Sequence, residues 1–89
     1  MAENILEKIE LEEEVNNIDL KKYRVVFKSF DFFNGYYSYI ELLSDSERAF
    51  LRISFEEDDG SGNTYNVSEL YKVDYDKSIS FFHRNSHGN

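Results

Sequence analysis

Apolar and polar positions alternate over much of residues 23–56, which predicts a sheet built from several strands. The alternation begins with apolar residues at odd positions and continues with apolar residues at even positions. The odd set is Tyr23, Val25 and Phe27, and the even set is Phe30 and Phe32. A change of parity within one strand predicts either a β-bulge or a strand covered on both faces.

Asn34-Gly35 follows this strand and predicts a two-residue hairpin, because both residues accept the positive φ angles of a type I′ turn. With these two residues at the centre of the turn, the numbers of paired residues add up to 69. The pairs predicted in this register are Phe32 with Tyr37, Phe30 with Tyr39, Phe27 with Leu42 and Lys28 with Glu41. Two aromatic pairs and one pair of opposite charge are the combinations that stabilise neighbouring strands.

A third strand follows, in which Phe50 is the one exception to the alternation. Its inward positions are Ala49, Leu51, Ile53 and Phe55, and its outward positions are Arg48, Arg52, Ser54 and Glu56. Residues 57–63 read as an acidic loop, and an extended pattern resumes at 64–67. Residues 68–71 fit either one helical turn or the start of a strand. The apolar pairs 73/75 and 79/81 predict a last hairpin that turns near Asp76-Lys77.

Residues 3–15 have helix-forming composition, without Gly or Pro, and we expect a helix over this range. Its apolar residues do not share one face, however, because Ile5, Leu6 and Ile9 lie well over 100° from Leu11 and Val15 on a helical wheel. The helix therefore ends or bends near Glu10, or it lies between two apolar surfaces. A strand over residues 9–12 is the third alternative.

These elements predict an α+β fold, with an N-terminal helix packed on a small antiparallel sheet of four to five strands. The alternative is a small, mostly-β barrel with a helical cap. We expect one domain over residues 1–89, with a disordered tail at about 85–89.

Composition adds a negative charge and many aromatic rings to this picture. Eighteen Asp and Glu oppose ten Lys and Arg, for a formal net charge of −8, while eight Phe and seven Tyr argue for a folded core. The charge is uneven: residues 1–20 hold seven acids and one base, 21–40 hold one acid and four bases, and 41–60 hold seven acids and two bases. Two acidic blocks therefore flank one basic segment. Such a surface either keeps an aromatic protein soluble or attracts a basic partner.

The candidate chemical motifs do not predict a catalytic or metal site. The acidic loop fails the calcium-loop rule, because the frame from Glu57 places Ser68 where a bidentate Glu belongs. His83 and His87 have the spacing of helical metal ligands but no completing partner, and cysteine is absent. No Ser has an activating context. We therefore expect a protein that is not an enzyme and has no cofactor, metal or catalytic residue.

The function predicted from these features is that of an acidic protein-binding module. Its partner would present a basic protein surface, as a nuclease or another nucleic-acid enzyme does. The carboxylates would inhibit that enzyme by imitating the phosphates of its substrate. Immunity proteins and phage-encoded inhibitors are the analogy for this mode of action. The predicted partner-binding residues are Glu10, Glu12, Glu13, Glu14, Glu56, Glu57, Asp58, Asp59, Tyr36 and Tyr37. Tyrosines enter this set because they are enriched in binding interfaces.

Two other function classes stay open at this point. Two apolar faces on the N-terminal segment would suit a self-assembling structural or accessory protein, including a homodimer. A single-stranded nucleic-acid binder that uses Lys22, Arg24, Lys28 and Phe30 is the third class, which the net charge disfavours. The sequence shows neither a signal-peptide pattern nor an apolar run of membrane-spanning length, so we expect no membrane partner. The expected location is the cytoplasm of a bacterial or phage-infected cell.

Overall fold

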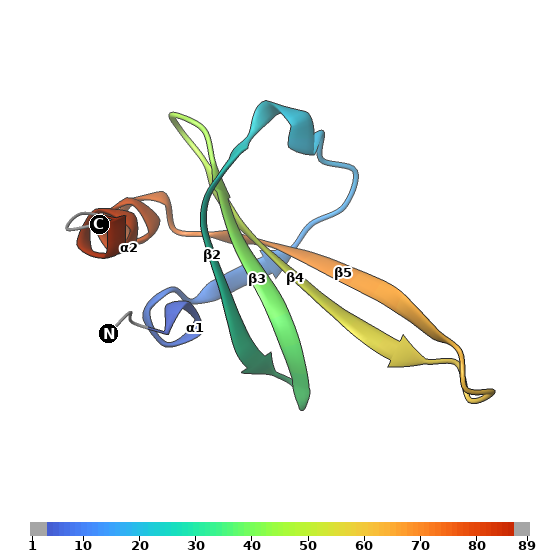
Figure 1. Cartoon of the computed structure of the whole chain (residues 1–89). Coiled ribbons are helices and arrows are strands. Elements are labelled where there is room, and N and C mark those ends of the chain that lie inside the picture. The colour runs from blue at the N-terminus through green and yellow to red at the C-terminus, as the bar shows by residue number, and fades with distance from the viewer. Residues whose placement is uncertain (1–3, 87–89) are drawn as a thin grey trace.

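The computed structural model describes residues 4–86 and shows a five-stranded, open antiparallel sheet with two α-helices (Figure 1). The strand order is β1-β5-β4-β3-β2. The elements are α1 (Ile5–Lys8), β1 (Leu11–Glu14), the 3-10 turn η1 (Leu20–Lys22), β2 (Arg24–Phe33), β3 (Tyr36–Ser44), β4 (Ala49–Asp58), β5 (Thr64–Val73) and α2 (Tyr75–Ser86). The predicted α+β class with an antiparallel sheet is confirmed, and the sheet is open rather than closed into a barrel.

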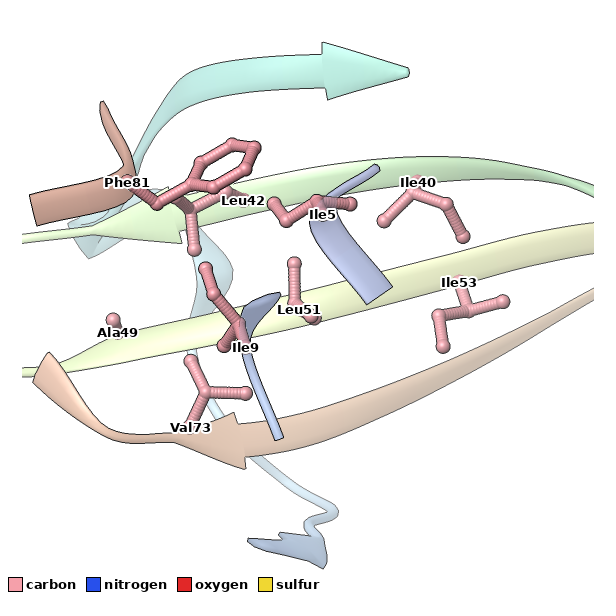
Figure 2. Close-up of a cluster of buried hydrophobic side chains, with 9 residues drawn as sticks. All are labelled: Ile5, Ile9, Ile40, Leu42, Ala49, Leu51, Ile53, Val73 and Phe81. Carbon is pink, nitrogen blue, oxygen red and sulfur yellow. The ribbon is translucent and has the colours of Figure 1, made fainter. Parts of the chain in front are cut away.

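The hydrophobic core lies between the two helices and one face of the sheet, which we call the helix face (Figure 2). It consists of Ile5 and Ile9 from the N-terminal segment, Phe81 from α2, and Ile40, Leu42, Ala49, Leu51, Ile53 and Val73 from the strands. All nine side chains are buried. The inward positions predicted for β4 are therefore confirmed for Ala49, Leu51 and Ile53, and Phe55 packs against the same cluster while remaining partly exposed.

The helix predicted over residues 3–15 is wrong beyond Lys8, because only Ile5–Lys8 is helical. The chain then forms β1, which pairs with β5 through Leu11 opposite Val73 and Glu14 opposite Tyr71. One helix could not have buried both apolar sets. The turn of α1 buries Ile5, and the extended chain after it follows the sheet. The two apolar faces that suggested self-assembly are thus used within one chain.

The last predicted hairpin is also wrong, because residues 75–86 form α2. Asp74 decides the outcome: its carboxylate accepts the Lys77 backbone N–H at 2.9 Å, as a helix-capping side chain does. Its carbonyl accepts both the backbone N–H and the hydroxyl of Ser78. The expected disordered tail is corrected at its start, since α2 runs through residues 85–86, while residues 87–89 lie outside the described residues.

The hairpin at Asn34-Gly35 has the predicted register. Both turn residues have positive φ, at 51° and 85°. The observed pairs include Phe32 with Tyr37, Phe30 with Tyr39, Lys28 with Glu41 and Phe27 with Leu42. A register shift lies between Val25 and Phe27, so a bulge is present, but it comes before the change of parity. Phe30 and Phe32 have the other parity because they point away from the helix face.

The second face of the sheet, which we call the opposite face, is covered only at one end. The chain between β1 and β2 crosses the sheet there, and Val15 donates a backbone hydrogen bond to Leu70. Tyr23 meets Phe50 edge to face with ring centroids 5.0 Å apart, and Leu43 and Phe50 are buried. Phe50 thus breaks the alternation of its strand because it has a small core of its own.

The sheet divides into two hairpins at its far end. Pairing between β3 and β4 stops at Tyr39 opposite Ser54. Pairing within β2–β3 continues to Phe33 opposite Tyr36, and pairing within β4–β5 continues to Asp58 opposite Thr64. Both hairpin tips extend away from the helices (Figure 1). Near the tips, Phe32 and Tyr37 are exposed, whereas Phe33 and Phe55 pack against the edge of the core.

Candidate protein-binding surface

Paired carboxylates and tyrosines form a row on the helix face that runs from the edge of the core, where Tyr71 packs, to the β4–β5 hairpin. The Tyr71 hydroxyl donates to the Glu69 carboxylate at 2.7 Å, and the Tyr65 hydroxyl donates to the Glu57 carboxylate at 2.9 Å. Glu14 lies directly opposite Tyr71 on β1. Tyr36 adds a stacked pair of rings, because it lies against Phe55 at 4.7 Å across the division between β3 and β4. We call Glu14, Glu57, Glu69, Tyr36, Tyr65 and Tyr71 the carboxylate–tyrosine row.

The strand register sets the spacing of this row. Glu57 is opposite Tyr65, and Glu69 lies four positions after Tyr65 along β5. At the rise of a β-strand this is about 13 Å, and Glu14, opposite Tyr71, lies about 7 Å further along. The three carboxylates therefore form a line of roughly 20 Å on one face. The alternation of β5 positions explains it, since residues 65, 67, 69, 71 and 73 share that face.

Two tyrosines of the row, Tyr71 and Tyr65, have raised pKa values, and the carboxylates beside them contribute to both shifts. Burial of the phenol, followed by the hydrogen bond to Glu69, raises the pKa of Tyr71 to about 12, and the charge of Glu14 contributes. The hydrogen bond to Glu57 raises the pKa of Tyr65. The two hydrogen bonds from hydroxyl to carboxylate fix the orientation of each pair.

Basic side chains of the central strands project from the opposite face. Arg52 bonds Glu41 there at 2.7 Å. Lys28 is opposite Glu41, and Lys72 is opposite Glu13. Arg24 is the basic residue of β2 with helix-face parity, and it lies beside α2, at the end of the sheet away from the hairpin tips. Among residues 4–86, no basic residue forms an ion pair with a carboxylate of the row.

The structure divides the first predicted block. Glu10 is exposed between α1 and β1. Glu12 lies at the bulge of β1, beside Lys72 and Arg48. Glu13 faces Lys72 on the opposite face, and only Glu14 belongs to the carboxylate–tyrosine row. Consecutive residues of a strand point to opposite faces, so a block in sequence does not become a patch on the sheet.

The second predicted block is divided in the same way. Glu56 accepts a hydrogen bond from Thr64 on the opposite face, while Glu57 belongs to the row. Asp58 accepts the backbone N–H of Gly60. Asp59 accepts the N–H and the hydroxyl of Ser61, which lowers the pKa of its carboxyl. The two aspartates therefore order the β4–β5 turn.

The two predicted tyrosines also separate, because they are neighbours in β3. Tyr36 belongs to the row, and Tyr37 lies on the opposite face, where it stacks on Phe30 at 5.7 Å. Phe30, Tyr37 and Tyr39 line one side of a shallow hollow of about 440 Å³. Phe55 and four polar residues, Ser54, Ser68, Asn66 and Glu56, complete its lining. This hollow combines exposed rings with a carboxylate, which disfavours phosphate-bearing ligands.

A metal ion needs a set of ligating side chains that the fold brings together. No three His, Cys, Asp or Glu side chains within residues 4–86 are arranged to hold a metal ion. His83 lies on α2, and His87 lies outside the described residues. Neither helix within 4–86 is long and apolar enough to cross a membrane.

Sequence reasoning missed Glu69, Tyr65 and Tyr71 as parts of the site. The signal that identifies them is the alternation over residues 64–73 combined with a β4–β5 register. That register needs the position of the turn, and the loop of residues 59–63 is too long to fix it from turn chemistry alone.

A comparison with models of known protein families gives no match, and comparisons with curated proteins and with solved structures give none either.

Proposed function

We propose that this chain is a non-enzymatic binding module for a basic protein and that it docks through the carboxylate–tyrosine row. The observation that carries the proposal is the sorting of charge between the two faces of the sheet. Glu14, Glu57 and Glu69 share the face from which no Lys or Arg of β3, β4 or β5 projects. Their field is therefore not neutralised locally and attracts a cationic surface.

The tyrosines support a protein partner over a small ion. Tyr36 and Tyr65 are exposed and rigid, since one is stacked on Phe55 and the other is bonded to Glu57. Rings held in place in this way give contact area with little loss of conformational freedom on binding. Arginine suits such a surface best, because its guanidinium pairs with carboxylates and also stacks on aromatic rings.

A nucleic-acid enzyme is the class of basic partner that we favour. Such an enzyme binds a line of phosphates, and the row offers a line of carboxylates about 20 Å long on a β-sheet. The chain would then occupy the substrate groove and act as an inhibitor. Direct binding to nucleic acid is disfavoured, because the same carboxylates repel phosphate.

The experiment compares three forms of the tagged protein in a pull-down from a bacterial lysate. The test variant, Glu14→Gln/Glu57→Gln/Glu69→Gln, removes the carboxylates of the row. The matched control, Glu10→Gln/Glu47→Gln/Asp76→Asn, removes the same charge from exposed positions outside it. We expect the wild type and the control to retain the same basic protein, which salt or added DNA releases, and the test variant to lose it.

Equal retention by all three forms would refute the proposal, and so would an equal loss in both variants, which would mean that net charge alone governs binding. If a nuclease is retained, adding the wild-type chain to that purified enzyme should inhibit DNA cleavage, and the test variant should not. Circular dichroism of both variants checks that the sheet is intact.

A further inference from the structure

The outer edge of β2 is a long strand edge without a partner among residues 4–86. β2 has ten residues, whereas β1 at the other edge has four, of which three are Glu. A short, charged edge strand resists pairing with other chains, and a long one invites it. On β2 the side chains of Phe30 and Phe32 are 59% and 70% exposed.

The hairpin turn determines which backbone groups face this edge. Phe33 and Tyr36 flank the two-residue turn, so they form a hydrogen-bonded pair. Hydrogen-bonded and non-hydrogen-bonded pairs alternate from there along an antiparallel ladder. The N–H and C=O groups of Phe32, Phe30 and Lys28 therefore point outward, away from β3. The residues with free backbone groups are thus the same residues whose rings are exposed.

We propose that β2 is a homodimer interface, at which the β2 strand of a second copy pairs in antiparallel orientation around Phe30. The two sheets then form one ten-stranded sheet with the opposite faces on the same side. In this register Phe30 pairs with the partner's Phe30, and Lys28 lies opposite the partner's Phe32. The regular part of β2 extends from Phe27, after the bulge, to Phe33, before the turn, and Phe30 is its midpoint.

Self-complementarity favours this register over its neighbours. A two-fold axis requires each pair of residue numbers to have an even sum, and centring on Phe30 gives 60. Ser29 then faces the partner's Asp31, and its hydroxyl, which donates to Asp31 of its own chain at 3.2 Å, can donate its one proton to the partner's carboxylate instead. Centring on residue 31 would oppose two Asp31 carboxylates, and centring on residue 29 would place Asp31 against the partner's Phe27. Both alternatives leave a carboxylate without a donor across the interface.

The charge distribution permits a second copy at this edge although each chain carries −8. β2 contains two basic residues, Arg24 and Lys28, and one acid, Asp31. The carboxylate-rich segments lie on β1, at the other edge of the sheet, and at the β4–β5 turn. Charges separated by more than a Debye length are screened at physiological salt. Raising the salt concentration therefore strengthens the dimer, whereas it releases the basic partner proposed above.

The experiment measures the mass of the untagged full chain in solution by sedimentation, from low concentration up to about 1 mM. We expect the mass to rise from 10.6 kDa towards twice that value, and to rise at lower concentration when salt is added. The variant Phe30→Lys opposes two ammonium groups at the centre of the interface and should stay monomeric. The matched control Tyr37→Lys changes a ring of similar exposure, 64%, on the neighbouring strand and should still dimerise.

Hydrogen exchange gives an independent readout of the edge. The amides of Lys28, Phe30 and Phe32 should exchange more slowly as the protein concentration rises, while the amides of β1 should not respond. A single-chain mass throughout the concentration range would overturn the proposal. A dimer that persists unchanged in Phe30→Lys would overturn it as well, because the contact would then lie elsewhere.

Discussion

Phe81 is the fully buried apolar side chain by which α2 packs on the sheet, and Phe81→Ala is the substitution that tests its contribution. Phe81 is fully buried, at 0% exposure, and meets Phe27 of β2 edge to face at 4.9 Å. It lies in the same cluster as Ile5 and Leu42 (Figure 2). Among residues 75–85 of α2, the other fully buried side chain is Ser78, which supplies little apolar area.

The expected cost is about 3–5 kcal/mol, the range for removing a buried Phe ring from a packed core. A domain of this size has a free energy of unfolding of roughly 5–13 kcal/mol. The substitution therefore removes a large share of the total. Urea unfolding followed by circular dichroism should show a lower midpoint with an unchanged slope, because the surface exposed on unfolding is nearly the same.

Phe82→Ala is the matched control, since the neighbouring ring is only partly buried and the helix loses the same atoms. Its cost should be clearly smaller. If Phe81→Ala does not fold, Phe81→Leu should still fold and lose about 1–2 kcal/mol. A loss below about 1 kcal/mol for Phe81→Ala, or equal losses for the two alanine variants, would refute the conclusion that this ring anchors α2.

Two further predictions concern the hairpin turn and the carboxylate–tyrosine row. Gly35 has φ +85°, and the Cβ atom of an alanine at this position would meet no heavy atom within 4 Å. Gly35→Ala should therefore cost about 1–2 kcal/mol of folding stability from backbone strain alone, whereas D-alanine, introduced by chemical synthesis, should cost nothing. Equal urea midpoints for the two isomers would contradict this. The pKa of Tyr71 is about 12 in the folded chain against 10.0 for an ordinary tyrosine, so its contribution to stability is complete below pH 10 and is lost as the pH rises towards 12. Tyr71→Phe should make the decline of stability over pH 10–12 shallower, as measured by urea unfolding at each pH, and an unchanged decline would contradict the assignment.

Local chemistry made the β2–β3 hairpin predictable, although it lies at one edge of the sheet. Asn34 and Gly35 tolerate positive φ, and a two-residue turn leaves one register for the strands beside it. Alternation in β4 likewise identified Leu51 and Ile53 as core residues, because strand side chains point to alternate faces. The separation of the acidic blocks follows from the same rule, but it becomes visible only when the strands are known.

The ends of the chain were decided by contacts between residues far apart in sequence. Residues 11–14 have helix-forming composition but form β1, because β5 offers backbone partners about 60 residues away. The apolar residues 73, 75, 79 and 81 fit both a hairpin and a helix, and the hydrogen bonds from Asp74 together with the pocket for Phe81 select the helix.

The sequence by itself determined the antiparallel sheet, the turn between β2 and β3, and the excess of negative charge. Tertiary structure decided which carboxylates share a face and which strand edge stays unpaired. The physical reason is that a turn depends on the φ and ψ angles of two adjacent residues, whereas a surface depends on the register between strands. That register is set by burial of the whole core.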